Sequence, residues 1–202
     1  IKFLKKDNKQ KIIKNILLPV TSNKKYKMVD FSIDTQQKDI FRISQDDELF
    51  AKQVIIDLYK KGYIFDKFLG KGGIGIVLQF KYQGGLIAVK ASYPSQYSKV
   101  KKMKSAAIYI ENNKHICGNN FKYILQFKYI GEGSQMFFDK KSEYFSSEIM
   151  EDDLFNYVNH YLPRMVNNYN KENNIKYIKC QLIYGIYCIH QMGMIHGDIK
   201  FE

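Results

Sequence analysis

The sequence predicts an α+β fold in which antiparallel strands come first and helices follow. Residues 69–90 hold two short apolar runs on either side of Gly84-Gly85. This is the pattern of a β-hairpin, because glycine readily reaches the positive φ that tight hairpin turns need. Residues 175–191 instead place apolar side chains three or four positions apart, as one buried helix face requires. These side chains are Ile175, Ile178, Leu182, Ile186 and Ile189.

The composition is that of a globular protein with a core. Of the 202 residues, 45% are hydrophobic and 15% are aromatic. The net charge is +12, yet the only arginines are Arg42 and Arg164. Because the lysines are spread along the chain, and arginine is the preferred residue for bidentate phosphate and base contacts, we expect no nucleic-acid partner.

The cysteines predict a reduced protein. Cys117, Cys180 and Cys188 form no CxxC pair, and an odd number argues against a disulfide framework. We therefore interpret Cys180 and Cys188 as small apolar packing groups and expect an intracellular, cytoplasmic chain. No apolar run approaches the ~20 residues of a membrane span. Because the chain begins at Ile1, a targeting signal ahead of it would not be seen.

Residues 1–62 are predicted to form an N-terminal extension. Its first 25 residues are rich in lysine and carry a short apolar patch that ends at Pro19. We expect a tail here, or the remnant of a preceding domain. A basic amphipathic segment in contact with a membrane is the alternative.

The rest of the extension reads as two strands and a helix. The strands are predicted over Tyr26–Ile33 and Ile40–Ile43. Ser44 and the three acidic residues after it suit a helix start, and apolar residues keep helical spacing up to Gly62. This order resembles the end of a pleckstrin-homology domain. The other interpretation is an extension that packs on the domain that follows.

A glycine-rich segment leads into the hairpin. Gly70, Gly72, Gly73 and Gly75 permit a loop whose backbone N–H groups face a phosphate. Lys90, at the end of the second strand of the hairpin, would bring a positive charge to the same phosphates. A dinucleotide-binding unit would need a helix after these glycines, whereas a strand follows here.

The remaining elements are predicted in order along the chain. They are a helix over Lys99–Glu111, strands over Phe121–Ile130 and Glu143–Ile149, a helix starting at Leu154–Val158, a linker over 159–174, and the helix over 175–191. Gly193 is the expected C-terminal cap of that last helix.

This succession of motifs resembles a protein-kinase domain over residues 63–202. Val77 lies two residues beyond Gly75, and Ala88-Val89-Lys90 ends the next strand. Ser147-Glu148-Ile149-Met150 resembles the kinase hinge, and His196-Gly197-Asp198-Ile199-Lys200 resembles the catalytic loop. The resemblance implies an antiparallel five-stranded small lobe with one helix, followed by the first helices of a truncated helical large lobe.

The family pattern implies ATP, Mg²⁺ and a protein substrate. Asp198 would be the catalytic base and Lys200 would stabilise the transferred phosphate. Glu111, the one acidic residue between Asp66 and Glu132, would be the partner of Lys90. The implied ATP-binding residues are Leu69, Gly70, Lys71, Gly72, Gly73, Ile74, Gly75, Ile76, Val77, Ala88, Lys90, Glu111, Ser147, Glu148 and Met150.

Two departures from the family pattern bear on activity. Gly197 replaces the usual arginine, so we expect activation that does not depend on pairing between that arginine and a phosphorylated loop. No metal ligand is predicted within the chain, because the family's metal-binding residues would come after Glu202. We therefore expect no phosphate transfer by residues 1–202 alone.

The acceptor and the activity are the remaining questions. Lys200, two residues beyond Asp198, resembles the Ser/Thr class of protein kinase. One alternative is a small-molecule phosphotransferase of the aminoglycoside or choline kinase type, in which His-Gly-Asp is the usual catalytic loop. The other alternative is a pseudokinase or scaffold that keeps the fold without the chemistry.

Overall fold

The computed structural model describes residues 14–19, 26–31, 33, 42–133, 141–151, 154–164, 168–197 and 199. The chain divides into two compact units. The sheet unit comprises Lys2–Lys104 and Phe127–Ile149. The helical unit comprises Ser105–Gln126 and Met150–Glu202.

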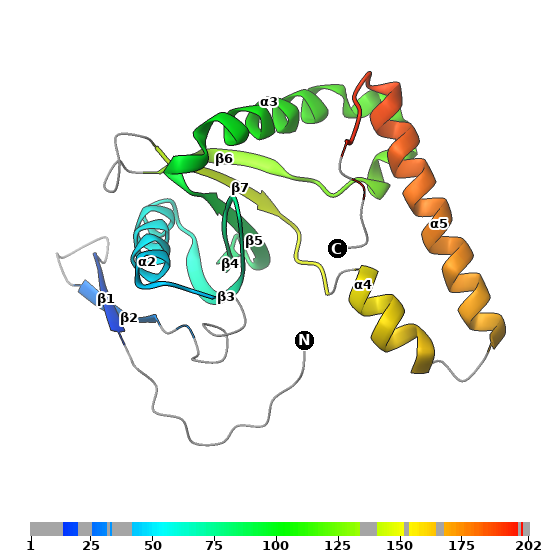
Figure 1. Ribbon diagram of the computed structural model, residues 1–202. Coiled ribbons are helices and arrows are strands. Elements are labelled where there is room, and N and C mark those ends of the chain that lie inside the picture. The colour runs from blue at the N-terminus through cyan, green and yellow to red at the C-terminus, as the bar shows by residue number, and fades with distance from the viewer. Residues whose placement is uncertain are drawn as a thin grey trace. The chain divides into compact units, whose positions relative to one another are not determined.

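The sheet unit is built on a five-stranded antiparallel sheet in the order β3-β4-β5-β7-β6 (Figure 1). The strands are β3 (Ile64–Gly72), β4 (Gly75–Tyr82), β5 (Gly85–Ser92), β6 (Lys128–Glu132) and β7 (Glu143–Ser147). Gln83 and Gly84 form the two-residue turn between β4 and β5, with φ of 48° and 81°. Such turns match the twist of a hairpin. The predicted hairpin is confirmed, with its turn one residue earlier than expected.

Helix α2 (Gln45–Tyr59) packs against one face of this sheet, as Figure 1 shows. A capping box fixes its start, because Ser44 Oγ accepts a hydrogen bond from the Asp47 backbone and the Asp47 carboxylate accepts one from the Ser44 backbone. The predicted helix is confirmed. The largest fully buried side chains of this shared core are Val54, Ile55, Leu58, Ile76, Leu78, Phe80, Val89 and Tyr144. Burying each large apolar side chain contributes ~1.5–3 kcal/mol, so α2 and the sheet stabilise one another.

Two further strands precede α2. β1 (Lys14–Pro19) pairs antiparallel with β2 (Tyr26–Phe31) in a separate two-stranded sheet. The strand predicted from Tyr26 is therefore confirmed. The apolar patch before Pro19 is also a strand, which was not predicted. The interpretation of the N-terminal region as a tail or as the remnant of a preceding domain stays a prediction. Of the strand predicted over 40–43, Arg42 lies in a turn with φ of 49° and Ile43 is in no strand. Residues 40 and 41 lie outside the described residues.

Helix α3 (Tyr97–Asn113) begins in the sheet unit after a short 3₁₀ turn, η1 (Pro94–Gln96), and confirms the helix predicted there. Lys104 Nζ donates to the Tyr129 hydroxyl at 2.9 Å and lies 3.3 Å from a carboxylate oxygen of both Glu132 and Glu143. The bond to Tyr129 and the two carboxylates raise the pKa of Lys104. This charged cluster fastens the first half of α3 to β6 and β7.

The helical unit contains the second half of α3, a 3₁₀ segment η2 (Lys114–Tyr123), short helical turns and the long α5 (Asn168–Gln191). The short turns are α4 (Leu154–Asn156), the π-helical η3 (Tyr157–Tyr161) and η4 (Leu162–Arg164). α5 ends in a Schellman motif, in which Gly193, with φ of 73°, donates to the His190 carbonyl and Met194 donates to that of Ile189. The predicted cap is confirmed.

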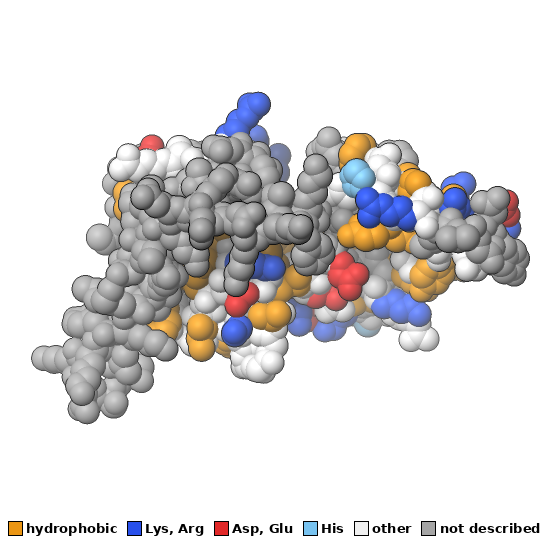
Figure 2. Space-filling model, turned by 90° about the horizontal axis from the view of Figure 1, so that it is seen from below, with side chains coloured by type: hydrophobic (Ala, Val, Ile, Leu, Met, Phe, Trp, Pro, Cys, Tyr) orange, Lys and Arg blue, Asp and Glu red, His pale blue; other side chains and the backbone are white. Residues whose placement is uncertain are grey.

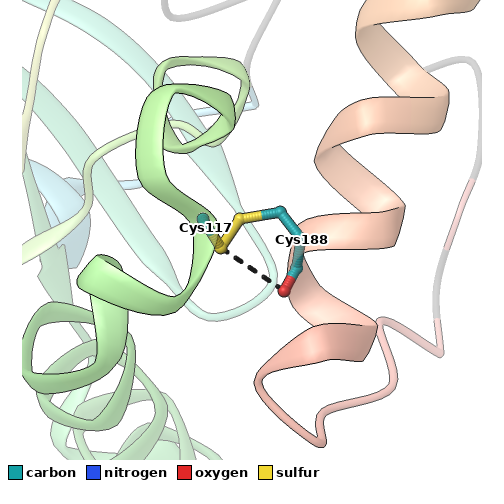
Figure 3. The surroundings of a disulfide bond; sticks show 2 residues. All are labelled: Cys117 and Cys188. Carbon is teal, nitrogen blue, oxygen red and sulfur yellow. Dashed lines mark hydrogen bonds between the residues drawn. A yellow bond between two sulfur atoms is a disulfide. The ribbon is translucent and has the colours of Figure 1, made fainter.

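A disulfide joins Cys117 of η2 to Cys188 of α5 (Figure 3). The two Cα atoms are 5.2 Å apart, and both cysteines belong to a buried cluster with Phe121 and Met192. Cys180 is free and exposed. The expectation of a chain without disulfides is therefore wrong, because an odd cysteine count leaves one thiol over but does not keep the other two apart. Cys188 is buried as interpreted, whereas Cys180 is not.

Three other expectations for the helical elements need correction. Residues 121–123 belong to η2, so only the last part of the predicted strand Phe121–Ile130 lies in β6. The predicted linker over 159–174 is helical at both ends, and α5 begins at Asn168, well before Ile175. The predicted buried stripe is correct in part. Ile175, Ile178, Ile186 and Ile189 are half-buried, but Leu182 is 47% exposed, and the fully buried positions of α5 are Gly185 and Cys188.

No helix in the described part of the chain is both long enough and apolar enough to cross a membrane. On the face shown in Figure 2, lysine and arginine side chains are scattered among hydrophobic and acidic ones. The expectations about nucleic acid, membrane contact and location stay predictions.

Candidate active site

The glycine-rich loop is the turn between β3 and β4. Gly72 and Gly75 are paired at the end of the ladder, with Gly73 and Ile74 between them. The Tyr93 backbone donates to the Ile74 carbonyl at 2.8 Å, which ties the loop to the end of β5. A Cβ on Gly75 would lie only 2.0 Å from the Ala91 carbonyl oxygen, so glycine is required there by the packing of the strands.

Gly72 and Gly73 differ from Gly75. A Cβ on either would meet nothing within 4 Å, and neither has a positive φ. The described part of the chain therefore contains no steric or conformational reason for glycine at these two positions. A bare backbone with open space above it suits the close approach of a bound phosphate group.

The strand register places four of the predicted ATP-binding residues side by side. Val77 is opposite Lys90, and Ala88 is opposite Ser147. Residues opposite one another in antiparallel strands point to the same side of the sheet. This side is the reverse of the one covered by α2, because the alternate residues Ile76, Leu78 and Val89 are the ones in the core with α2.

Lys90 is half-buried on this face, beside Val77 and Phe145. Removal from water lowers the pKa of its ammonium group. Within the described part of the sheet unit Lys90 has no ion-pair partner. A partly desolvated cation on the sheet that carries the open glycine loop suits an anionic ligand.

Two residues predicted in the loop have side chains engaged elsewhere. Ile76 is fully buried in the core with α2, so only its backbone is available to a ligand. Lys71 Nζ lies 2.6 Å from an Asp47 carboxylate oxygen and 3.1 Å from the Arg42 carbonyl oxygen. The Lys71 side chain is thus directed toward α2. No pattern in the sequence relates Lys71 to Asp47, because acidic residues at a helix start indicate only a favourable interaction with the helix dipole.

The other predicted residues lie along the chain as follows. Leu69 and Gly70 are in β3, and Ser147 ends β7 with Glu148 just beyond it. Glu111 and Met150 belong to the helical unit, where Glu111 forms an exposed ion pair with Lys114 at 2.6 Å. Asp198 and Lys200 lie outside the described residues. The pairing of Lys90 with Glu111 and the catalytic roles of Asp198 and Lys200 stay predictions.

Gly197, the residue before Asp198, has φ of 72°. Glycine adopts this conformation without strain, whereas arginine would not. The positive φ at position 197 therefore favours the glycine found here over the arginine of the family pattern.

Among the described residues, no group of three His, Cys, Asp or Glu side chains is arranged to hold a metal ion.

A family model of the protein kinase domain matches residues 63–202, which is more than half of the chain. The chain belongs to the protein kinase family. The crystal structure of the PF14_0431 kinase domain is similar to it, with a TM-score of 0.51 and 22% sequence identity. The similarity covers 69% of this chain and 38% of that one, so the chain spans less than half of that kinase domain. No curated protein matches the chain.

These comparisons confirm the predicted fold class. The five strands β3 to β7 and α3 correspond to the five-stranded small lobe with one helix, and α4 and α5 to the first helices of the large lobe. At 22% identity the similarity to the solved structure concerns the fold alone.

Proposed function

We propose that this chain is part of a protein kinase that transfers the γ-phosphate of ATP to a protein hydroxyl group. The observation that carries the proposal is Lys90, a half-buried lysine with no ion-pair partner in the described sheet unit. It lies on the same sheet as two loop glycines, Gly72 and Gly73, that face open space. An anionic nucleotide would supply the missing counter-charge.

The proposed roles follow the family pattern. The loop backbone and Lys90 hold the phosphates, Val77 and Ala88 form the apolar wall against adenine, and Glu148 and Met150 offer backbone groups to its edge. Asp198 accepts the proton of the attacking hydroxyl and Lys200 stabilises the transferred phosphate. Mg²⁺ would neutralise charge on the phosphates.

The first test is nucleotide binding by the full-length protein. Mg-ATP should raise the melting temperature of the wild type through preferential binding to the folded state. Lys90→Met should abolish this increase. Lys128→Met, which removes an exposed lysine from β6, is the matched control and should respond like the wild type. A Lys90→Met variant that Mg-ATP stabilises as strongly as the wild type would contradict the proposal.

The second test separates transfer from binding and identifies the acceptor. Asp198→Asn should keep the Mg-ATP response and lose phosphate transfer. We infer serine and threonine as acceptors from Lys200, and phosphoamino-acid analysis of labelled protein substrate checks this. Transfer to small alcohols or aminoglycosides instead of protein would favour the small-molecule phosphotransferase. Mg-ATP binding without transfer to any acceptor would favour the pseudokinase or scaffold.

A further inference from the structure

Asp47, which precedes the matched kinase domain, accepts hydrogen bonds on both carboxylate oxygens. One carboxylate oxygen accepts hydrogen bonds from Lys71 Nζ at 2.6 Å, from the Ser44 backbone at 2.7 Å and from Ser44 Oγ at 2.8 Å. The other accepts one from the Tyr93 hydroxyl at 2.6 Å. The side chain is only 8% exposed. A carboxylate that is buried and bonded on both oxygens is held in one orientation.

Two of these partners belong to the glycine-rich loop or bind it directly. Lys71 lies between Gly70 and Gly72 on the incoming side of the loop. Tyr93 donates its backbone N–H to the carbonyl of Ile74, near the tip. One carboxylate on α2 therefore contacts the loop by two separate routes, at its start and near its tip.

Further contacts hold the same partners in place. The Tyr93 ring lies against that of Phe50 on α2, with centroids 5.3 Å apart. Lys71 Nζ also donates to the Arg42 carbonyl at 3.1 Å. Both the acceptor on α2 and the donors around the loop are thus fixed by their own neighbours.

We propose that Asp47 is a positioning residue that holds the glycine-rich loop in its nucleotide-binding conformation through Lys71 and Tyr93. The inference rests on the proposed nucleotide-binding function. It assigns to α2, which precedes the residues matched by the kinase family model, a direct influence on the affinity of the site. It also assigns Lys71 to the anchoring of the loop instead of to the phosphates.

The physical reason is the freedom of a glycine-rich backbone. Gly70, Gly72 and Gly73 leave the loop many conformations, and nucleotide binding selects a few of them. Anchoring both sides of the loop beforehand reduces the ordering that binding must impose. Releasing the anchor lowers the populated fraction of the competent conformation, and the apparent affinity falls by the same factor.

The test uses Asp47→Asn, Lys71→Met and the double variant in the full-length protein. Hydrogen exchange of the 70–76 amides, measured without nucleotide, should accelerate in each. The KM for ATP should rise by about five-fold in each single variant, with kcat little changed. The double variant should be no worse than Asp47→Asn alone, because Lys71 acts on the loop only through that carboxylate, whereas Lys71→Met leaves the route through Tyr93 in place. Lys71→Arg should restore most of the wild-type KM, since a guanidinium can still donate to Asp47.

Lys67→Met is the matched control, because Lys67 is an exposed lysine on the same strand, outside the loop. It should leave loop exchange and KM unchanged. An increase in KM for Lys71→Met without one for Asp47→Asn would mean that Lys71 contacts the nucleotide directly, and would overturn the inference. Unchanged loop exchange in both variants would also overturn it. A wild type that binds no nucleotide refutes the proposed function, whereas the exchange measurement still tests the anchoring of the loop.

Discussion

The hydrogen bonds to the Asp47 carboxylate also lead to a prediction about stability in acid. Burial by itself would raise the pKa of this carboxyl, but hydrogen bonds from Lys71, Tyr93 and Ser44 outweigh it and lower the pKa to about 2. The folded-state pKa lies below the ordinary value, so the contribution to stability is complete above pH ~4 and is lost as the pH falls toward 2. Asp47→Asn should lower the free energy of unfolding by about 2 kcal/mol at pH 6 and by much less near pH 2.

Urea unfolding of both proteins across this pH range measures the difference. Asp46→Asn changes an exposed neighbour in the same helical turn and should show no such pH-dependent gap. If the gap between wild type and Asp47→Asn stays constant from pH 6 to pH 2, the bonds to the carboxylate do not stabilise the fold in the way described.

The buried hydrogen bond of Tyr144 leads to a second prediction, which concerns the free energy of unfolding. Its side chain is 1% exposed, and its hydroxyl donates to Asp57 at 2.8 Å, a carboxylate that also accepts from Gln53. Tyr144→Phe removes one donor from a buried carboxylate, which should cost about 1–3 kcal/mol of unfolding free energy. Tyr97→Phe, at an exposed position, should cost almost nothing. Equal stabilities for the two variants in urea unfolding would show that the buried hydrogen bond contributes nothing net.

At the scale of elements, the loop between β3 and β4 contains one glycine that strand packing requires, Gly75, and one that faces open space, Gly73. Gly75→Ala would bring a Cβ against the Ala91 carbonyl, so the strands must shift and stability should fall by about 1–3 kcal/mol. Gly73→Ala meets open space and should leave the melting temperature nearly unchanged while it weakens Mg-ATP binding. Melting curves with and without Mg-ATP test both. A Gly73→Ala variant with wild-type nucleotide affinity would mean that the loop backbone does not approach the phosphates.

The elements that could be predicted from the sequence are those with a local cause. Glycine at the turn after Tyr82, the capping residues at Ser44 and the cap at Gly193 each act within a few neighbouring residues. The misassigned elements depend on partners in other elements. The apolar patch before Pro19 becomes a strand because β2 pairs with it, and a short apolar run does not distinguish strand from helix by itself. The most buried positions of α5 differ from the predicted ones because α5 packs on η2 through Gly185 and Cys188.

At the scale of the whole molecule, the family motifs predicted the candidate site and its order along the chain, and the strand register brings Val77, Ala88, Lys90 and Ser147 together. The contact of Asp47 with Lys71 could not be predicted, since it joins residues on separate elements that no motif relates. The same is true of the bond between Cys117 and Cys188, which are 71 positions apart. The number of cysteines and their spacing along the chain do not show which side chains meet in three dimensions.

The disulfide makes the last prediction. Closing a loop of this length restricts the unfolded chain, which by the chain-entropy model stabilises the fold by roughly 4 kcal/mol. Reduction, or the Cys117→Ser and Cys188→Ser double variant, should therefore lower the urea midpoint, and reductant should have no further effect on that variant. Cys180→Ser removes the free, exposed thiol and should keep both the wild-type midpoint and its sensitivity to reductant. Without reductant, denatured wild type should expose one reactive thiol out of the three cysteines. Three reactive thiols under those conditions would show that the bond does not form, and the stability of the helical unit would then rest on the packing of Phe121 and Met192 around the two cysteines.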